Sequence, residues 1–370
     1  MAIMQTYQAS AGNREDLIPA ITMISPSDTP LGSSIGTKKA TGINHEWLTD
    51  TLATPALNAV LEGADATFGV LAPRVRIGNY IQNIRATGLI SDNQEAVLKA
   101  GVKSEYSYQL EKKTKEVALD IERAYTQGVK QAATTGGTPS QQIGASTMGG
   151  LLYWLTTNRT DGAAAAPNTG TATAGSATTI TAAAGHGAVA NQSYIYLTGG
   201  TGQGQYRAIT NVATNVLTVA AWDVIPDTTT TYAVYVAPAA LTETLLNDAF
   251  ESAFGQGGNP NVVLAPTKQK RAISGFASSI RRLTADGQSL TNSIDVYESD
   301  FGRHAVKTDR WMPAGTLAIV ETKNFDAAFL RPVKPEELAR TGSARKFMIE
   351  AAVTLEARAE NSSALVIGLL

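Results

Sequence analysis

Serine, glycine and histidine residues occur in this chain in patterns that could support catalysis. The segment GSSIG at 32–36 has the G-x-S-x-G spacing, in which Ser34 would be the nucleophile. Such a serine needs a strand before it, a helix after it and a histidine base later in the chain. Pro30 precedes the segment, no core strand leads into it, and the only late histidine is His304. A serine hydrolase using Ser34 is therefore an alternative with little support, and we predict that the chain is not an enzyme.

Two further patterns suggest ligand binding at first sight. The segment GGTGQG at 199–204 lacks the Gly-Lys-Ser/Thr of a P-loop and the spacing of a dinucleotide fingerprint, so we interpret it as a tight turn. The three histidines, His45, His186 and His304, lie in unrelated segments without metal-ligand spacing. We predict no catalytic, cofactor-binding or metal site, and no cofactor.

Composition narrows the class of protein further. The chain has 370 residues, no cysteine and a net charge of −2, and its few basic pairs are scattered. Strong phosphate binding needs clustered lysine and arginine, which this sequence does not supply. No apolar run approaches the roughly 18 residues of a membrane span, and the N-terminus lacks a signal peptide pattern. We expect no membrane partner and no specific reading of nucleic acid.

The longest helical pattern covers residues 92–128 and would organise the other elements. Asp92 followed by Glu95 resembles a capping box, and Gly128 is a natural stop. Gly101 costs about 1 kcal/mol relative to alanine inside a helix, so the firm part begins near Val102. Its apolar residues at helical spacing are Val102, Tyr106, Leu110, Val117, Ile121 and Tyr125. So narrow a stripe predicts a helix that lies across a sheet or a neighbouring chain.

An extended arm and a long hairpin are expected before this helix. Residues 1–41 offer no periodicity for a core, so we interpret them as an arm. Segments 42–51 and 74–90 are strand-like and predict two arms of a hairpin, with 53–73 as its tip and a bulge at Gly78. Polar residues on both faces leave such a hairpin little to bury in its own subunit.

The second half of the chain predicts a mixed α+β fold. Residues 163–237 carry only three charged side chains and short alternating runs, which favour an inserted all-β domain. Helix returns at 241–254, and strands are expected near 262–265, 293–296, 317–320 and 328–330. Alternation over 346–358 predicts a strand with one buried face, on which the long helix would lie. Residues 364–370 would pair back on it as a hairpin.

Several motifs resemble those of one family. The chain is similar to one branch of the tailed-bacteriophage major capsid proteins with the Hong Kong 97-type shell fold. The motifs that carry the resemblance are GNREDL (12–17), ISPSDTPL (24–31), HEWLTDTL (45–52), EGADATF (62–68) and RIGNYIQ (76–82). The resemblance is specific over 12–130 and looser over 238–370, whereas 163–237 looks like an added β-module.

The resemblance implies a function in the virion. It implies hexamers and pentamers of an icosahedral shell that is assembled in the host cytoplasm and encloses double-stranded DNA without sequence preference. Portal, decoration or scaffolding proteins are the implied partners. The modest charge fits a container that does not grip its DNA. An encapsulin-like protein compartment is the alternative within the same fold.

The pattern and the resemblance together predict how the chain is divided. The predicted parts are the N-terminal arm (1–41), an extended β-hairpin loop (42–91), the spine helix of a peripheral domain (92–135), an axial domain (136–162 and 238–325), the inserted β-domain (163–237) and peripheral-domain strands (326–370).

Five residues of the hairpin are predicted to contact neighbouring subunits. Trp47, Phe68 and Tyr80 are candidate anchors in a partner's pocket. Arg74 and Arg76 would meet acidic groups across the interface. An exposed ion pair contributes only about 0–1 kcal/mol, so the aromatic anchors should matter more.

Overall fold

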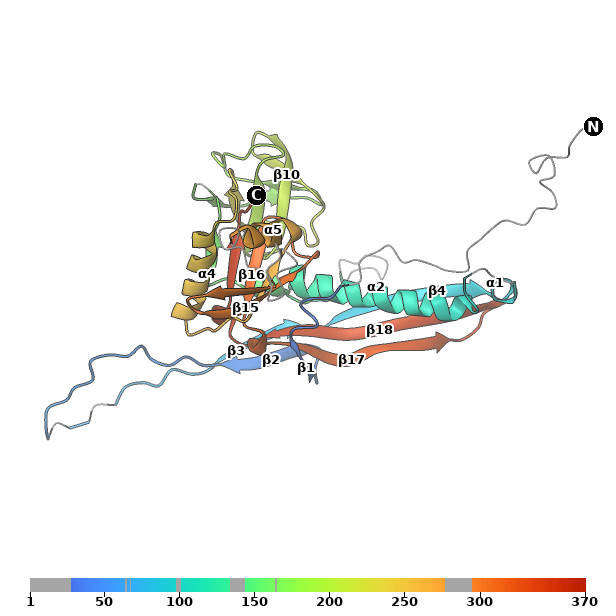
Figure 1. The fold of residues 1–370 in the computed structure, drawn as a ribbon, viewed down its shortest axis with the longest axis horizontal. Coiled ribbons are helices and arrows are strands. Elements are labelled where there is room, and N and C mark those ends of the chain that lie inside the picture. The colour runs from blue at the N-terminus through green and yellow to red at the C-terminus, as the bar shows by residue number, and fades with distance from the viewer. Residues whose placement is uncertain are drawn as a thin grey trace, which may run out of the picture.

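The computed structural model describes residues 28–63, 65–66, 68–97, 101–133, 144–163, 165–276 and 295–370. Most of the predicted arm, the end of the predicted spine segment and the start of the predicted strand at 293–296 lie outside these ranges. The described strands form sheets of four, six, seven and two strands. Together with the helices they make an elongated molecule, with a long α-helix over a flat sheet and a hairpin reaching out beyond it (Figure 1). The mixed α+β class is confirmed.

The four-stranded sheet supports the long helix. Its strands are β1 (Gly36–Lys39), β17 (Phe325–Leu338), β18 (Ala344–Ala357) and β4 (Gln82–Ser91), in that spatial order. Helix α2 (Glu105–Gln127) contacts β4 and β18, and the ring of Tyr106 packs edge-on against Phe347 with centroids 5.3 Å apart. The prediction that the C-terminal strand carries the long helix is confirmed.

The start of the long helix differs from the prediction. A short helix α1 (Asp92–Ala96) is capped by Ser91, and α2 begins separately after Ser104. Glu95 does not complete a capping box on α1. Its Oε2 accepts hydrogen bonds from the backbone amides of Glu105 and Tyr106, at 3.0 and 3.3 Å, and so caps α2. Gly101, whose φ is +84°, lies in the break, and the predicted end at Gly128 is confirmed.

The predicted second arm of the hairpin is two strands that belong to different sheets. Strand β3 (Val75–Tyr80) pairs with β2 (Asn44–Thr49) in continuous register, so the predicted bulge at Gly78 is wrong. Strand β4 pairs with β18 instead of continuing the hairpin. Ile81 separates the two strands and is buried against Ala40, Ala328 and Ala352. The alternation of inward and outward side chains therefore changes phase at Ile81.

The six-stranded sheet contains the strand that was expected to fold back on β18. Its order is β14 (Val296–Ser299), β15 (Gly302–Thr308), β13 (Val262–Ala265), β16 (Thr316–Val320), β19 (Ala364–Ile367) and β5 (Arg159–Asp161). Strand β19 pairs with β16 and β5, so the predicted C-terminal hairpin is wrong. All of β19 is buried, as expected of a strand with neighbours on both edges and covered faces. Helix α4 (Glu243–Gly255) packs on β19 and β5, and α5 (Thr267–Phe276) on β13 and β15.

Strand β17 is much longer than predicted. It contains Pro332 and Pro335, and its register with β18 shifts between Phe329 and Lys334. Its other edge pairs with β1 only over 326–329, so the prolines lie where β17 is an edge strand. Proline lacks an amide donor and is tolerated there.

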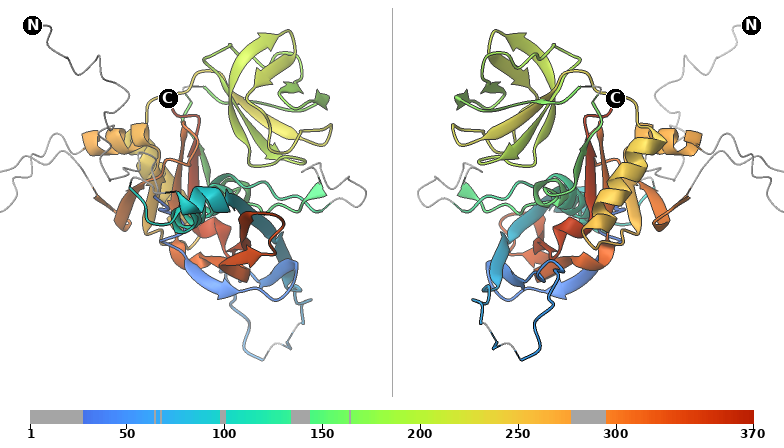
Figure 2. Two further views of the ribbon diagram at one scale, coloured as in Figure 1. Left: turned by 90° about the vertical axis from the view of Figure 1, so that its right-hand side faces the viewer. Right: turned by 90° about the vertical axis from the view of Figure 1, so that its left-hand side faces the viewer.

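The seven-stranded sheet is formed entirely by residues between 168 and 235. Its order is β6 (Asn168–Thr171), β12 (Thr231–Tyr235), β9 (Tyr194–Gly199), β10 (Tyr206–Ala213), β11 (Val216–Val219), β8 (Thr179–Thr181) and β7 (Ala174–Gly175). The sheet stands to one side of the body (Figure 2). A bridge between Ala163 and Pro238 places its two connections to the chain side by side.

The inserted sheet is firmly attached to the body. The Tyr196 hydroxyl donates to the Leu152 carbonyl at 2.9 Å, in the short helix α3 (Leu151–Trp154). Asp223 pairs with Arg123 of α2 at 2.9 Å. Tyr196, Tyr206 and Tyr235 belong to the main hydrophobic core.

Candidate subunit-contact surface

The hairpin extends away from the body of the subunit. Strands β2 and β3 pair from Asn44 with Tyr80 to Thr49 with Val75. Beyond them, the described residues of 50–74 form no helix or strand and run out as an open loop (Figure 1).

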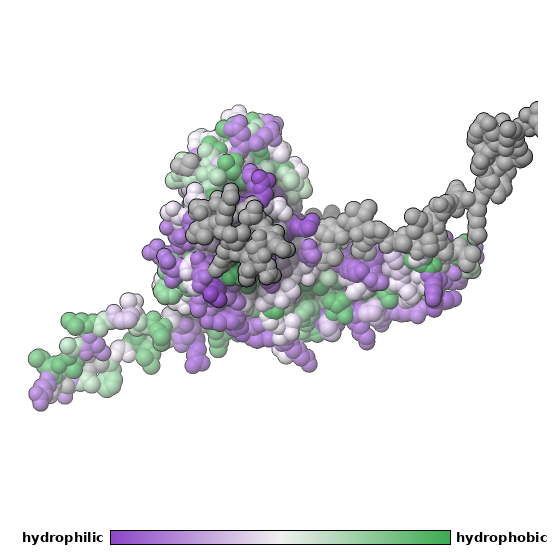
Figure 3. All heavy atoms as spheres, viewed as in Figure 1, coloured by the Kyte–Doolittle hydropathy of each residue, from purple (hydrophilic) through white to green (hydrophobic). Residues whose placement is uncertain are grey.

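Aliphatic and aromatic side chains line this loop with almost no cover from their own chain. Each of seven large apolar residues is at least 83% exposed: Leu52, Leu57, Val60, Leu61, Phe68, Val70 and Leu71. We call these seven residues the apolar tip, and hydrophobic side chains gather along this loop in Figure 3. Full burial of one such side chain contributes about 1.5–3 kcal/mol. Surfaces of this kind mark contacts with other molecules.

The base of the hairpin, in contrast, is packed within the subunit. The ring of Trp47 lies 5.5 Å from that of Trp154 and 5.9 Å from that of His45. On the neighbouring strand, the Asn79 side-chain amide donates to the carbonyls of Gly149 and Leu355, at 2.9 and 2.8 Å. These contacts fix the direction in which the tip extends.

A buried carboxylate holds the base of the hairpin to the four-stranded sheet. His45 Nε2 lies 2.8 Å from Glu356 Oε2, and Lys38 of β1 donates to Glu356 Oε1 at 3.0 Å. Burial alone would raise the pKa of Glu356, but the hydrogen bonds from His45 and Lys38 outweigh it and hold that pKa below its ordinary value. The outer face of β18, expected to be exposed to water, is therefore buried at its C-terminal end.

The five predicted contact residues are not gathered into one cluster. Arg74 and Arg76 face Asp50 and Glu46 of their own hairpin, at 3.8 and 3.3 Å. The Tyr80 ring lies 5.5 Å from the Lys130 ammonium.

Trp47 packs on its own chain, unlike an anchor in a partner's pocket, whereas Phe68 is 96% exposed in the tip. A role in subunit contact stays a prediction for all five residues.

Sequence reasoning missed the rest of the apolar tip and the residues that hold its base. The run LATPALNAVLEGADATFGVLAP carries a signal, since it is rich in leucine and valine but has neither helical nor strand periodicity. Nothing local identifies Glu356, because its partners come from strands distant in the sequence.

Ser34 is not arranged as a catalytic nucleophile. Its hydroxyl donates to the Pro30 carbonyl and accepts from Lys307 Nζ at 2.7 Å. The turn that contains it leads into strand β1, where a nucleophile elbow would require a helix. The hydrolase alternative has no support in this geometry.

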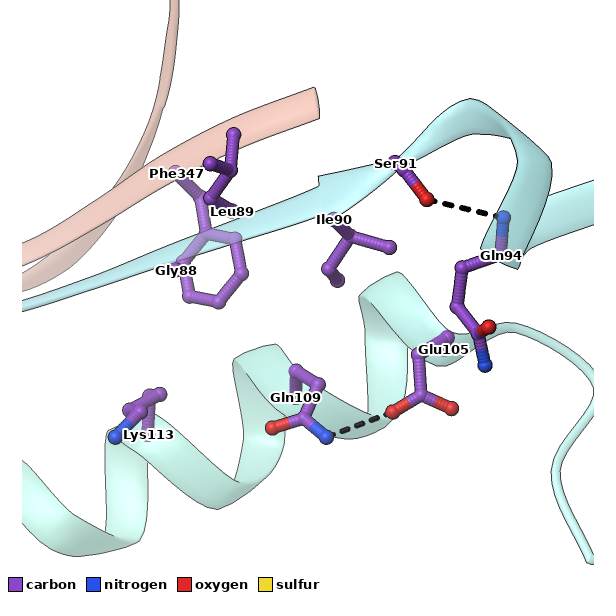
Figure 4. A pocket seen from close by; sticks show the side chains of 9 residues that line it. All are labelled: Gly88, Leu89, Ile90, Ser91, Gln94, Glu105, Gln109, Lys113 and Phe347. Atoms are coloured by element: carbon purple, nitrogen blue, oxygen red, sulfur yellow. Dashed lines mark hydrogen bonds between the residues drawn. The ribbon is translucent and has the colours of Figure 1, made fainter. Parts of the chain in front are cut away.

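A groove of about 500 Å³ lies between β4 and the helices α1 and α2 (Figure 4). Its polar side chains are engaged locally: Ser91 accepts from the Gln94 amide, and Glu105 accepts from Gln109. Phe347 forms part of its wall, over Gly88, where a Cβ would lie 2.2 Å from the ring. These residues shape helix ends and packing and do not converge on a reacting atom.

The described ranges hold neither a metal-binding cluster nor a membrane-spanning helix. No group of three or more histidine or acidic residues there could hold a metal ion. None of the helices described is both long and apolar enough to cross a membrane.

Solved structures define the class of this fold. The capsid of a native GTA particle superposes with a TM-score of 0.54 at 11% identity, covering 100% of both chains. The capsid of the Myoviridae phage XM1 superposes with a TM-score of 0.53 at 9% identity, covering 100% of this chain and 99% of the other. The chain therefore has the Hong Kong 97-type fold of phage capsid proteins.

Sequence comparison then identifies the family. The profile described as SU10 major capsid protein matches residues 4–370, and the chain belongs to this family of major capsid proteins. The major capsid protein of Escherichia phage Phieco32 is 27% identical over 344 residues, covering 91% of this chain and 89% of the relative. The family places the chain in the virion, as a structural component of the capsid.

Proposed function

We propose that this major capsid protein self-assembles into hexamers and pentamers of an icosahedral shell that encloses the double-stranded DNA genome of a tailed phage. The observation that carries the proposal is the apolar tip, whose seven large side chains find no cover in their own subunit. A second copy of the chain, repeated by symmetry, would supply that cover. The GTA capsid that shares the fold was itself solved with C5 symmetry, which supports a fivefold arrangement here.

The charge of the chain supports a container that does not grip its content. The net charge is −2, so the surface as a whole does not attract the phosphates of DNA strongly. We infer non-specific enclosure of DNA, with portal, decoration or scaffolding proteins as further partners.

The parts of this shell protein would be the arm, the hairpin, the spine helix on its sheet, the axial sheet and the insertion. In this proposal β4, which pairs with β18, would belong to the peripheral part, and β19, which pairs with β16, to the axial part.

Electron microscopy of particles from infected cells tests the proposal, combined with nuclease digestion of their content. The expected result is closed particles with fivefold vertices that protect double-stranded DNA from nuclease. Particles that hold a protein cargo and no DNA would favour the encapsulin-like compartment instead. Chains that never form particles would contradict both.

A further inference from the structure

Strand β4 leaves one edge of the four-stranded sheet without a neighbouring strand. It is the last strand in the sheet order and, among the described strands, pairs only with β18. The Asp92 amide donates to the carbonyl of Ser343, directly opposite, at 3.0 Å, and hydrogen-bonded positions alternate in an antiparallel pair. The backbone groups of Arg85, Thr87 and Leu89 therefore point to the free edge. Within the described ranges no backbone hydrogen bond reaches them from that side.

The edge of β4 lacks the features that usually keep a strand edge from pairing. Natural proteins blunt such edges with proline, bulges or outward charges. The opposite edge of this sheet has them, since β17 contains Pro332 and Pro335 and shifts its register. Strand β4 has neither over its ten residues, and its one charged side chain, Arg85, pairs with Glu350 of β18. The Leu89 side chain is 65% exposed, so this edge is a template for another strand.

One flank of helix α2 faces β4 across a groove of about 500 Å³. The flank consists of Glu105, Gln109 and Lys113, which are spaced one turn apart. In Figure 4 Glu105 lies nearest the end of β4, Lys113 lies farthest from it, and Gln109 lies between them, across from residues 88–90. Lys113 also pairs with Glu116, and both side chains are more than one third exposed or close to it, at 34% and 39%. The flank is therefore acidic at one end and basic at the other.

We propose that the β4 edge pairs with β4 of a second copy of the chain, antiparallel, about a twofold axis that passes through Leu89 perpendicular to the sheet. The proposal deepens the assembly function above and rests on it, since an icosahedral shell contains twofold axes. The axis sets Leu89 opposite Leu89 of the second copy, and Thr87 opposite Ser91 of the second copy. The outward backbone groups of both strands then bond one another, and the two exposed leucine side chains cover each other.

The two long helices fit the same arrangement. Helix α2 contacts both β4 and β18, so it lies over the boundary between these strands. Strands lie about 4.8 Å apart, which places each helix about 5 Å from the twofold axis. The two helices would then be about 10 Å apart, an ordinary packing distance. Because they run antiparallel, Glu105 of each copy meets Lys113 of the other, and the surface is complementary to itself in charge.

A single cysteine tests the pairing, because the chain has none of its own. Opposite residues of a hydrogen-bonded pair have Cα atoms about 5.5 Å apart, within the range of a disulfide. Leu338→Cys is the matched control, since Leu338 and Leu89 both lie opposite Lys346, on the two sides of β18. In assembled particles under mild oxidation, Leu89→Cys should give roughly tenfold more disulfide-linked dimer than Leu338→Cys.

The same experiment separates the pairing from shell formation. Equal dimer yields from the two cysteine variants, in particles that form normally, would overturn the pairing and leave the proposed function standing. Such a result would assign the β4 edge to another segment or another protein. Leu89 dimers from a chain that never forms particles would support the pairing and contradict the proposed function.

Charge exchange in the Leu89→Cys background tests the helix contact. Glu105→Lys and Lys113→Glu should each lower the dimer yield roughly fivefold, because each sets like charges across the axis twice. The combined variant restores opposite charges and should recover the yield. Glu111→Lys combined with Lys115→Glu exchanges an ion pair of α2 that does not line the groove, and should leave the yield unchanged. A combined variant no better than either single one, or a loss of yield in the control pair, would overturn the antiparallel helix contact.

Discussion

The indole rings of Trp47 and Trp154 pack against each other with centroids 5.5 Å apart, joining the hairpin to the helix α3. Trp154 Nε1–H in turn donates to the Gly149 carbonyl, and the Gly149 amide donates to the side-chain oxygen of Asn79 in β3. One face of the hairpin base therefore packs against the subunit core, whereas the tip is exposed throughout.

Trp47→Ala should destabilise the subunit as well as impair assembly. Truncation of a fully buried tryptophan to alanine lowers the free energy of unfolding by about 3–5 kcal/mol. For this half-buried ring we expect a loss of about 2 kcal/mol. Denaturant unfolding of the chain and particle counts by negative-stain microscopy are the two measurements. Trp47→Phe retains a ring against Trp154, so it should keep most of the unfolding stability and most of the particle count. An alanine variant as stable as the parent would show that the ring contact contributes nothing.

The apolar tip predicts a different outcome for substitutions near Leu57. Leu57→Asp combined with Leu61→Asp should leave the stability of the unassembled chain within about 0.5 kcal/mol, because both residues are exposed. The same pair should suppress closed particles, since two charges would enter a contact that buries apolar surface. Asn58→Asp combined with Ala59→Asp adds equal charge and leaves all seven side chains of the apolar tip in place. If the variant with both leucines replaced forms normal particles, the apolar tip does not take part in the subunit contact.

Glu356 predicts an acid-sensitive hairpin base. Its pKa in the folded chain is lowered from 4.5 by His45 and Lys38, so its stabilising effect is present above that value and is lost as pH falls through the folded pKa. Exchange of the β2 and β3 amides should therefore quicken on acidification below 4.5. Glu356→Gln should make this exchange faster at neutral pH and nearly independent of acid. Unchanged β2 and β3 protection down to about pH 3 would contradict the prediction.

Replacing residues 164–237 by a short Gly/Ser linker should be geometrically tolerated, because Ala163 and Pro238 are bridged. The shortened chain should nevertheless lose stability, by about 2–5 kcal/mol, since Tyr196, Tyr206 and Tyr235 leave the main core. Tyr196→Phe is the mild counterpart and should cost about 1 kcal/mol by removing one donor to the Leu152 carbonyl. A linker variant that unfolds at the same denaturant concentration as the parent would show that the insertion is an independent appendage.

Local patterns were sufficient for much of the fold. The alternation of Phe347, Ile349 and Ala351 predicts the buried face of β18, and Gly128 predicts the end of α2, because side-chain periodicity and chain stops are properties of neighbouring residues. The low charge of 163–237 likewise marked the segment that forms its own sheet. Family motifs then linked these elements to the shell fold.

Tertiary structure alone decided which distant residues meet. Strand β19 could pair equally well, on its sequence, with β18 or with β16, and the choice depends on which sheet leaves an edge free beside it. Glu122 looks like a solvent-facing residue of an amphipathic helix, yet the turn at Leu31 and Gly32 covers it and supplies two amide donors. The pairing of β19 with β16 joins segments about 50 residues apart, and the burial of Glu122 joins segments about 90 residues apart. No local periodicity records such contacts.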